Sequence, residues 1–435
     1  MINYEQARAY LARPEFQISR PGLKSMTELM HEMGDPQDEL SFVHISGTNG
    51  KGSVMAMLDQ ILIRAGYKTG RYLSPAVFAY EEKFRFCGQW ISPEDLARMT
   101  EVVAAAVERM RSRGSVLPTV FELETALAFA YFRDQGCDLC LVEVGMGGAE
   151  DATNIIRHTR VAILSSISVD HARYLGDTPA KIAAVKAGII KPGAAVVSAA
   201  QEEAVQEVFR QESRRLGCRL TFAEKDELTV LEEGPDGIRF NCGAWEKLQM
   251  PVCGAWQPAN AQLALMAVRA LREKGCEISD DAVRQGLANV RIPGRFEIRR
   301  RHPYVVTDGA HNPDAAVKLM HSVDRVFAGR RIWYIFGVFS DKEYDKIIQI
   351  TASRAAGIFT VPTSVPGRAV TSEDLAEAVR PVNAQVIPCA DMQEAVARAA
   401  EAAREEDVIL IFGSLSILAG AAQAIDRSWP ETTSI

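Results

Sequence analysis

The stretch at residues 42–53, FVHISGTNGKGS, decides the fold. Its first five residues form an apolar run that predicts a buried strand, and a helical pattern follows from Val54 to Ala65. A glycine-rich turn in this position is typical of a phosphate-binding loop, because glycines let the backbone approach phosphate oxygens and a helix start presents N–H groups. Lys51 would reach the β- and γ-phosphates of a nucleotide, and the Ser53 hydroxyl would position Mg²⁺.

The loop departs from the general phosphate-binding pattern G-x-x-x-x-G-K-[ST] in two places. Ile45 stands where the first glycine is expected, and Gly52 separates Lys51 from Ser53. A strand-to-helix turn without function is the competing interpretation. The combination of a lysine, three glycines and a flanking strand favours the phosphate loop.

Short apolar runs alternate with longer helical patterns from about residue 42 to 290, which predicts a mostly parallel sheet covered by helices. We expect strands at 42–46, 139–144, 161–168 and 194–199, and a helix over 121–132. A second series follows the Pro-Gly joint at 291–295, with strands expected at 304–308, 332–338, 357–361 and 408–412. We therefore predict an α/β protein with an N-terminal P-loop-type, mostly parallel sheet domain over 1–294 and a smaller Rossmann-like domain over 295–435.

Composition narrows the class of protein. At 435 residues the chain exceeds what one hydrophobic core usually serves, and its formal charge of −7 without a basic block argues against a nucleic-acid partner. The sequence has no long apolar run typical of a membrane span and no signal peptide pattern at its start, so we expect a cytoplasmic protein. Cys137 and Cys140 match C-x-x-C, but they run into an apolar stretch without a second pair, which favours buried strand cysteines.

Polar residues are predicted at the ends of several strands. Glu143 ends an apolar strand just before a glycine-rich turn, and ligands of open α/β sheets bind outside the carboxyl ends of strands. With Ser74 and His171 at the ends of other strands, Glu143 would form a Mg²⁺ site beside the phosphates. Hard cations prefer oxygen ligands, so His171 taken alone is more typical of a structural histidine.

The loop variant at 47–53 resembles the signature of the folylpolyglutamate synthase and dihydrofolate synthase family, a branch of the Mur ligase superfamily. The resemblance extends over nearly the whole chain, through short motifs in a fixed order. These motifs are SRPGL at 19–23, LSP at 73–75, FE at 121–122, EVGMGG at 143–148, DATN at 151–154, DH at 170–171, YLGDT at 174–178, KAGI at 186–189 and DGAHNP at 308–313. So many motifs in one order are far more specific than any one of them.

The resemblance implies roles for individual residues. For ATP binding it implies Asn49, Gly50, Lys51, Gly52, Ser53, Asn260, Arg295, Asp308 and His311. For metal binding it implies Ser53, Ser74, Glu143 and His171, and for catalysis Lys51, Glu143, His171 and Lys186. For a pterin or folate substrate it implies Phe121, Glu122, Asp151 and Ala152.

Lys186 has two interpretations. From periodicity alone it is a solvated helix lysine, like Lys181 and Lys191 around it. In the family the matching lysine is carbamylated and helps to hold a second metal, and we carry this over as a hypothesis. Ala76 and Ala149 stand where many relatives carry histidine and arginine, near the expected pterin site, so these departures bear on the acceptor and leave the catalytic residues intact.

The resemblance implies ATP-dependent addition of L-glutamate to a folate-type carboxylate through an acyl phosphate, giving ADP and phosphate. We expect a bifunctional enzyme that uses dihydropteroate and reduced folate as acceptors. The alternatives are another Mur-type amino-acid ligase with a different acceptor, and an inactive nucleotide-binding module. ATP and Mg²⁺ are the implied cofactors, and a second Mg²⁺ site and a site for K⁺ or another monovalent cation stay open. We expect a monomer whose partners are small molecules, without nucleic acid or membrane.

Overall fold

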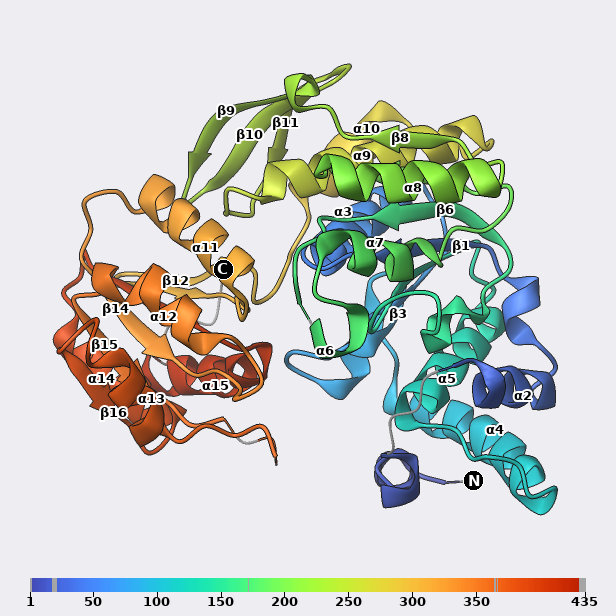
Figure 1. Ribbon diagram of the computed structural model, residues 1–435, viewed down its shortest axis with the longest axis horizontal. Coiled ribbons are helices and arrows are strands. Elements are labelled where there is room, and N and C mark those ends of the chain that lie inside the picture. The colour runs from blue at the N-terminus through green and yellow to red at the C-terminus, as the bar shows by residue number, and fades with distance from the viewer. Residues whose placement is uncertain (1, 18–21, 171, 364, 366, 430–435) are drawn as a thin grey trace. The chain divides into compact units, whose positions relative to one another are not determined.

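The chain folds into two compact units, each described here by itself. The computed structural model describes residues 2–17, 22–170, 172–363, 365 and 367–429. The first unit contains residues 1–76, 80–228 and 259–290, and the second contains 77–79, 229–258 and 291–435 (Figure 1). The segment 229–258, which the predicted boundary placed with the N-terminal domain, therefore packs in the second unit. The division of function between 1–294 and 295–435 stays a prediction.

An eight-stranded sheet of order β4-β3-β2-β5-β1-β6-β7-β8 forms the centre of the first unit. Six neighbouring strands, from β2 to β8 in this order, run parallel, and β3 and β4 are antiparallel at one edge. Every residue of β1 is buried, as expected for a strand that is covered on both faces. The strands are β1(Phe42–Ser46), β2(Thr69–Tyr72), β3(Phe84–Phe86), β4(Gln89–Trp90), β5(Leu139–Glu143), β6(Thr159–Leu164), β7(Ala195–Ser198) and β8(Leu220–Phe222).

Helices cover both faces of this sheet. The Thr69 hydroxyl donates a hydrogen bond to Asp59 on α3 at 2.7 Å, whereas a Cβ on Gly70 would lie 2.6 Å from the Phe132 ring on α5. Successive strand residues face opposite sides, so α3 and α5 lie on opposite faces. The helices of this unit are α1(Tyr4–Leu11), α2(Lys24–Glu32), α3(Lys51–Arg64), α4(Pro93–Ser112), α5(Val120–Asp134), α6(Ala172–Leu175), α7(Pro179–Ala187), α8(Glu203–Arg215), α9(Gln257–Glu273) and α10(Asp280–Ala288).

The second unit has a six-stranded sheet of order β12-β13-β17-β14-β15-β16 and a three-stranded antiparallel sheet of order β11-β10-β9. In the larger sheet only β12 is antiparallel to its neighbour among the pairings of the described residues. The strands are β9(Leu228–Gly234), β10(Gly237–Cys242), β11(Trp245–Met250), β12(Glu297–Arg301), β13(Tyr304–Thr307), β14(Ile332–Phe336), β15(Gly357–Thr360), β16(Val386–Pro388) and β17(Val408–Phe412).

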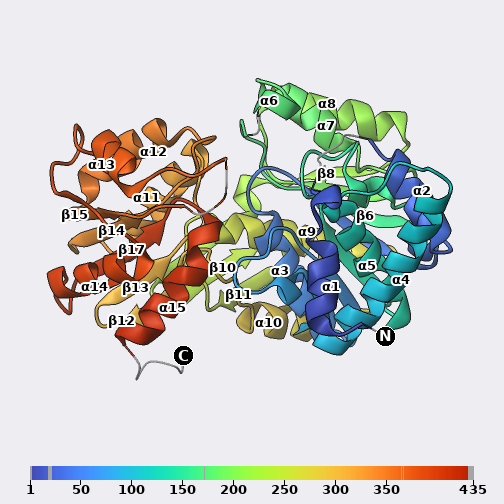
Figure 2. The ribbon, with the colours of Figure 1, turned by 90° about the horizontal axis from the view of Figure 1, so that it is seen from below.

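Two hydrophobic clusters lie on the two faces of the larger sheet of the second unit. Val408, Leu410 and Phe412 of β17 belong to one cluster, with side chains of α11, α12 and α13. The alternate residues Ile409 and Ile411 belong to the other, with α14 and α15 (Figure 2). The helices are α11(Pro313–Val326), α12(Tyr344–Thr351), α13(Ser372–Val379), α14(Met392–Ala402) and α15(Leu418–Ser428).

Short 3-10 helices complete the connections of both units. They are η1(Pro14–Phe16), η2(Pro36–Glu39), η3(Tyr80–Lys83), η4(Ala152–Ile155), η5(Lys225–Glu227), η6(Ala352–Arg354) and η7(Leu415–Ile417). Among the described residues no helix has the length and apolar character that crossing a membrane requires.

The predicted α/β class is confirmed, with a mostly parallel sheet in each unit. The strands predicted around residues 42, 139, 161 and 194 are β1, β5, β6 and β7, and those predicted in the second series are β13, β14, β15 and β17. Two boundaries differ by more than two residues. The helix after the loop begins at Lys51, because Gly50 in the left-handed region starts it, and β6 ends at Leu164, so that residues 165–168 form a loop.

Candidate functional site

The loop between β1 and α3 is fixed by the segment that follows β6. The Thr48 N–H donates to the Ser166 carbonyl at 2.8 Å. The Thr48 hydroxyl donates to the Ser168 carbonyl at 3.0 Å and accepts from the Ser168 N–H at 3.1 Å. A Cβ on Gly47 would lie 1.9 Å from Ser165 Oγ, so only glycine fits there. The first N–H groups of α3, which have no partner within a helix, are thereby held beyond the carboxyl end of β1.

Lys51 folds back over this loop. Its Nζ donates to the carbonyl oxygens of Gly47 and Thr48, both at 3.2 Å. Glu143 Oε1, at the end of β5, lies 3.7 Å from the same nitrogen, and the two side chains are only 17% and 12% exposed. The sequence motifs at 47–53 and 143–148 therefore meet in the structure, at the carboxyl edge of the sheet where ligands of α/β proteins bind.

Lys186, on the last turn of α7, also reaches the loop. Its Nζ donates to the Gly47 carbonyl at 2.9 Å, and the residue is only 5% exposed. Burial lowers the pKa of Lys186 to about 7, with a further lowering by the positive Lys51 and an opposing effect of Asp170 and Asp151. The interpretation of Lys186 as a solvated helix lysine is therefore wrong.

Asn260, near the start of α9, lies against the same loop. Gly50 has a φ of +93°, and a Cβ on it would lie 2.5 Å from Asn260 Oδ1. Two segments more than 200 residues apart in sequence are thus in contact at the predicted nucleotide site. Ser53 is buried on the first turn of α3, and Ser74 is half-buried two residues after β2.

The turn after β5 is built around Asp151. This buried carboxylate accepts hydrogen bonds from the Met146 N–H at 2.9 Å and from the Thr153 N–H at 3.0 Å. Burial raises the pKa of Asp151, and these hydrogen bonds oppose the rise. Ala152 is buried beside it. The role of Asp151 and Ala152 in substrate binding stays a prediction.

Phe121 and Glu122, at the start of α5, lie in different surroundings. The Phe121 ring packs on the turn after β5, since a Cβ on Gly145 would lie 2.6 Å from its Cζ. Glu122 caps its own helix by accepting from the Thr119 N–H at 2.6 Å, and it also accepts from the Ser25 hydroxyl. Phe121 thus lies beside the turn, and Glu122 has a structural partner for each carboxylate oxygen.

Three predicted nucleotide residues lie together in the second unit, at the carboxyl end of β13. Asp308 is buried and accepts from the N–H groups of Phe296 and Ala310, both at 2.7 Å. Burial raises the pKa of Asp308, and Arg295 opposes the rise. His311 Nδ1 lies 2.8 Å from the Gly309 carbonyl, which can only accept, so Nδ1 carries the proton.

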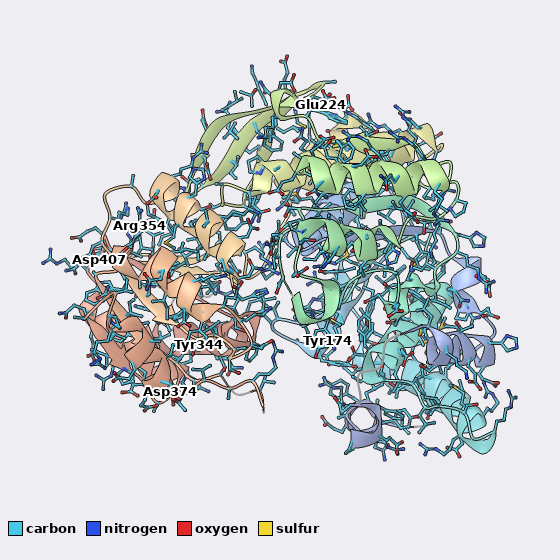
Figure 3. All side chains as sticks on the ribbon, viewed as in Figure 1. Tyr174, Glu224, Tyr344, Arg354, Asp374 and Asp407 are labelled. Atoms are coloured by element: carbon cyan, nitrogen blue, oxygen red, sulfur yellow. The ribbon has the colours of Figure 1, made fainter. Side chains whose placement is uncertain are left out.

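One predicted ligand, His171, lies outside the described residues. Within the described part of the chain, no three His, Cys, Asp or Glu side chains are grouped so that they could hold a metal ion. Tyr174, from the YLGDT motif that follows His171 in sequence, is 70% exposed on α6 (Figure 3). Cys140 is buried in β5, as predicted for a strand cysteine, whereas Cys137 precedes the strand and is only half-buried.

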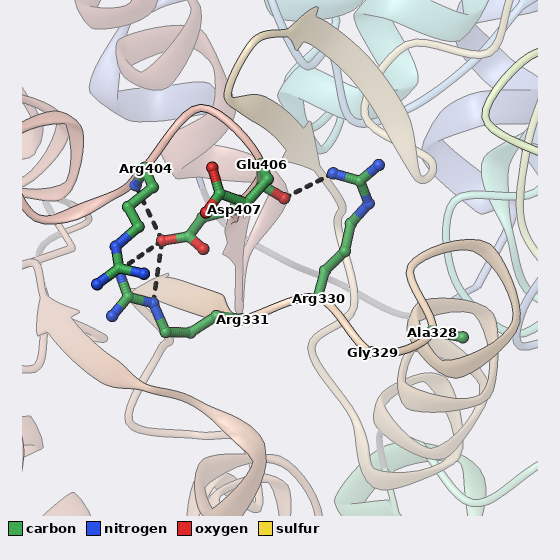
Figure 4. A pocket seen from close by; sticks show the side chains of 7 residues that line it. All are labelled: Ala328, Gly329, Arg330, Arg331, Arg404, Glu406 and Asp407. Atoms are coloured by element: carbon green, nitrogen blue, oxygen red, sulfur yellow. Dashed lines mark hydrogen bonds and ion pairs between the residues drawn. The ribbon is translucent and has the colours of Figure 1, made fainter.

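A hollow of about 510 Å³ in the second unit does not coincide with any predicted site residue. It is lined by Ala328, Gly329, Arg330, Arg331, Arg404, Glu406 and Asp407 (Figure 4). It lies at the amino ends of β14 and β17, whereas ligands of α/β sheets bind at carboxyl ends. Asp407 there accepts from Arg331 at 2.7 Å and from the Arg404 N–H at 2.9 Å, which fixes the turn before β17.

Several residues that shape the loop were not singled out in the sequence. Thr48, Ser166 and Ser168 hold the phosphate loop by mutual hydrogen bonds. The sequence does show serines at 165, 166 and 168, directly after a buried strand and at the edge of the sheet where the phosphate loop was expected. Because a single strand was predicted through Ser168, these serines were not recognised as part of a loop.

Comparisons with known proteins match both parts of the chain. The Mur ligase middle domain family matches residues 45–268, and the Mur ligase glutamate ligase domain family matches residues 294–415. The dihydrofolate synthase/folylpolyglutamate synthase of Bacillus subtilis is 34% identical over 383 residues, which cover 86% of this chain and 88% of that protein.

Solved structures extend the likeness to the fold. Mycobacterium tuberculosis folylpolyglutamate synthase complexed with ADP superposes with a TM-score of 0.88 at 32% identity, covering 97% of this chain and 98% of that one. E. coli FolC in complex with DHPP and ADP gives a TM-score of 0.87 at 28% identity, covering 98% of each chain.

The two matched domains and the lysine-bearing loop define the class as a Mur-type ATP-dependent ligase. Within that class, the chain belongs to the folylpolyglutamate synthase and dihydrofolate synthase family.

Proposed function

We propose that this chain joins L-glutamate to the carboxylate of a pterin-containing acceptor, with dihydropteroate and reduced folate as the two acceptors. The observation that carries the proposal is the meeting of Lys51 and Glu143 at the phosphate loop, 3.7 Å apart. The Bacillus relative is named for both activities, and the E. coli structure holds DHPP and ADP together. These names support the choice of acceptor.

The residues of the loop would bind the nucleotide. The N–H groups at the start of α3 would cradle phosphate oxygens, with Asn49, Gly50, Gly52 and Ser53 around them. Lys51 would exchange its bonds to loop carbonyls for bonds to the β- and γ-phosphates, where a positive charge stabilises the transferring phosphoryl group. In the second unit, Arg295, Asp308 and His311 are the residues that we propose for ATP binding.

The reaction would proceed in two steps. An oxygen of the acceptor carboxylate attacks the γ-phosphorus, the bond to the β-phosphate oxygen breaks, and ADP leaves. The amine of glutamate then attacks the acyl carbon, phosphate departs with the bonding electron pair, and the amine loses a proton as the amide forms. Phe121, Asp151 and Ala152, on and around the turn after β5, would bind the acceptor together with Glu122 at the start of α5, and exclusion of water would protect the acyl phosphate.

The donor set at this edge suits Mg²⁺. Glu143 Oε2 lies 3.7 Å from the position that a Cβ on Gly52 would take, so the carboxylate covers the first turn of α3 beside Ser53. Oxygen donors are those that Mg²⁺ prefers, and Ser53, Ser74 and Glu143, together with His171, would hold it. The ion would supply charge neutralisation at the γ-phosphate. A site for K⁺ or another monovalent cation stays a prediction.

Lys186 is proposed to be carbamylated. A pKa of about 7 leaves a substantial fraction of the amine neutral at neutral pH, and the neutral amine is the form that reacts with CO₂. The resulting anion would lie beside the Gly47 carbonyl and would help to hold a second Mg²⁺. The monomeric state and the cytoplasmic location stay predictions.

The test is phosphate release measured together with product mass. Wild-type protein is incubated with ATP, Mg²⁺ and glutamate, and with dihydropteroate or tetrahydrofolate as acceptor. We expect glutamate-dependent release with both acceptors, and products heavier by one glutamyl residue. Phosphate release that requires a non-pterin carboxylate and does not occur with either pterin acceptor would favour another Mur-type ligase. Nucleotide binding without release in the presence of every acceptor would favour an inactive module.

A further inference from the structure

A buried histidine lies in the strand that leads into the phosphate loop. His44 is fully buried in β1 among the apolar residues Phe42, Val43 and Ile45. Its Nε2 lies 2.9 Å from Thr153 Oγ1, and the Thr153 hydroxyl donates to Asp151 Oδ1 at 2.5 Å. A continuous chain of hydrogen bonds therefore runs from β1 to the carboxylate that organises the turn after β5.

The direction of each hydrogen bond in this chain follows from Asp151. The carboxylate also accepts from the N–H groups of Met146 and Thr153, so it acts as an acceptor only and the single hydroxyl proton of Thr153 points to it. Thr153 Oγ1 must then accept from His44, which places the histidine proton on Nε2. Burial and the positive Lys191 lower the pKa of His44 to about 3, so the ring is neutral as this arrangement requires.

His44 lowers the stability of the fold more than an apolar residue at this position would. Its Nδ1 is buried and is without a hydrogen-bond partner in the described part of the chain. A buried acceptor without a partner destabilises a fold, and an apolar side chain in this strand would avoid that cost. We therefore expect the Nε2 hydrogen bond to serve a purpose that offsets this loss of stability.

These hydrogen bonds hold the turn after β5 on its buried side, and strand β1 holds the same turn at a second point. Ser46, two residues after His44, donates from its hydroxyl to the Gly147 carbonyl at 2.9 Å. Strand β1 thus fixes both the Met146 N–H, through Thr153 and Asp151, and the Gly147 carbonyl directly. The turn begins next to Glu143, and β1 continues into the phosphate loop, so both halves of the site are attached to one strand.

We propose that His44 and Thr153 are positioning residues that orient Asp151 and the turn at 145–148 for the acceptor substrate, in register with the phosphate loop. This inference rests on the proposed function for the identity of the acceptor. Neither residue touches the reacting atoms, and both act through Asp151.

The decisive variants are T153V and T153S. Valine has nearly the shape of threonine and removes the hydroxyl, whereas serine keeps the hydroxyl. We expect T153V to raise the KM for dihydropteroate or tetrahydrofolate at least 10-fold with the affinity for ADP within 2-fold of wild type, and T153S to stay near wild type. In a double-mutant cycle, H44L and T153V together should raise the acceptor KM no more than T153V alone, because both substitutions break the same chain of hydrogen bonds. H44Q, which offers an amide N–H in place of Nε2, should recover part of the loss.

A second measurement tests the positioning without the reaction. Hydrogen exchange of the Met146 and Thr153 amides should be at least 10-fold faster in T153V than in T153S, with exchange in α8 unchanged. Equal exchange rates in the two variants overturn the inference. Faster exchange with an unchanged acceptor KM overturns its link to the acceptor. Wild-type protein that uses no pterin acceptor overturns the proposed function instead, and the exchange rates then still decide whether His44 and Thr153 position the turn.

Discussion

Lys186 Nζ donates a hydrogen bond to the carbonyl oxygen of Gly47 at 2.9 Å. Lys51 donates to the same oxygen at 3.2 Å, so two lysines share one neutral acceptor in a buried place. Burial is the main reason why the pKa of Lys186 falls to about 7, and the positive charge of Lys51 lowers it further. The charge of Lys186 therefore changes near neutral pH, where the enzyme would work.

The first prediction concerns stability and pH. The pKa of Lys186 is about 7 in the folded chain and about 10.4 in an unfolded one, so between these values the unfolded chain binds more protons. The stability of wild type relative to K186M should therefore rise as the pH increases from 7 to 10. Urea unfolding in CO₂-free buffer measures it.

The matched control for this prediction is K181M on the same helix. The Lys181 side chain is 65% exposed and pairs with Asp177 at 2.8 Å. The stability difference between wild type and K181M should stay nearly constant over the same pH range. A flat difference for K186M as well would show that Lys186 is not held in a low-pKa environment.

The second prediction is that Lys186 takes up CO₂. Its neutral amine attacks the carbon of CO₂, a carbon–nitrogen bond forms, and one proton leaves to solvent. Protein in ¹³C-bicarbonate should therefore show a carbamate carbon signal in NMR, and Mg²⁺ should strengthen it. The signal should vanish in K186R and persist in K181R. Its persistence in K186R would assign the carbamate to another amine.

Lys186 also illustrates where the sequence was insufficient. The helical pattern around it gave no reason to bury a lysine, because burial comes from segments distant in sequence. A Cβ on Gly148 would lie 2.7 Å from the Val185 carbonyl, and one on Gly188 would lie 2.5 Å from Ala149 Cβ. These glycines let the end of α7 pack directly on the turn after β5. Such close approach depends on tertiary structure and leaves no local periodicity.

The strands show the opposite case. Buried runs such as FVHIS and VILIF predicted β1 and β17 to the residue, because strands covered on both faces are mostly apolar along their length. The strands β9, β10 and β11 were not predicted. In β9 exposed and half-buried residues are mixed, among them Glu232, so the run reads as a polar loop. Likewise the candidate site residues were chosen by motif, whereas the contacts that hold them, such as that of His44 with Thr153, required the three-dimensional structure.

The third prediction concerns the left-handed glycine of the loop. Gly50 has a φ of +93°, so alanine there costs about 1–2 kcal/mol in backbone strain. Its Cβ would also displace Asn260, whose Oδ1 would be 2.5 Å away. We expect G50A to weaken ADP binding at least 10-fold, which is about 1.4 kcal/mol, measured by calorimetry.

Gly66 supplies the control for G50A. It has a φ of +90°, and among the described residues no atom beyond its chain neighbours lies within 4 Å of its added Cβ. G66A should therefore lose a similar amount of stability from strain while its affinity for ADP stays as in wild type. Equal ADP affinities in G50A and G66A would exclude a role of the contact with Asn260.

The fourth prediction concerns the charge of Glu143. E143Q keeps the shape of the side chain and removes its negative charge, which would hold Mg²⁺ near the γ-phosphate. We expect turnover to fall at least 100-fold, about 2.7 kcal/mol in the barrier, with ADP affinity within a few-fold of wild type. Higher Mg²⁺ should be needed for half-maximal phosphate release. E150Q, an exposed residue of the same turn, should leave turnover unchanged. Turnover of E143Q within 2-fold of wild type would show that the charge of Glu143 has no role in the reaction.

The last prediction concerns the helix that carries the loop. In α10, a Cβ on Gly286 would lie 2.5 Å from the Cα of Ile61 in α3, so the two helix backbones approach as closely as glycine permits. G286A must separate them and should destabilise the first unit by about 1–3 kcal/mol. G420A in α15 is the control, since its nearest atom is Met392 Cβ at 3.9 Å and alanine raises helix propensity, which should stabilise by up to about 1 kcal/mol.

The shifts of the two variants in urea unfolding should therefore have opposite signs. Because α3 begins at the phosphate loop, G286A should also weaken ADP binding, whereas G420A should not. Stabilisation by both substitutions would mean that α3 and α10 adjust without strain. In that case the position of the loop would depend on β1 and on the segment after β6, and the packing of α10 would be irrelevant to nucleotide binding.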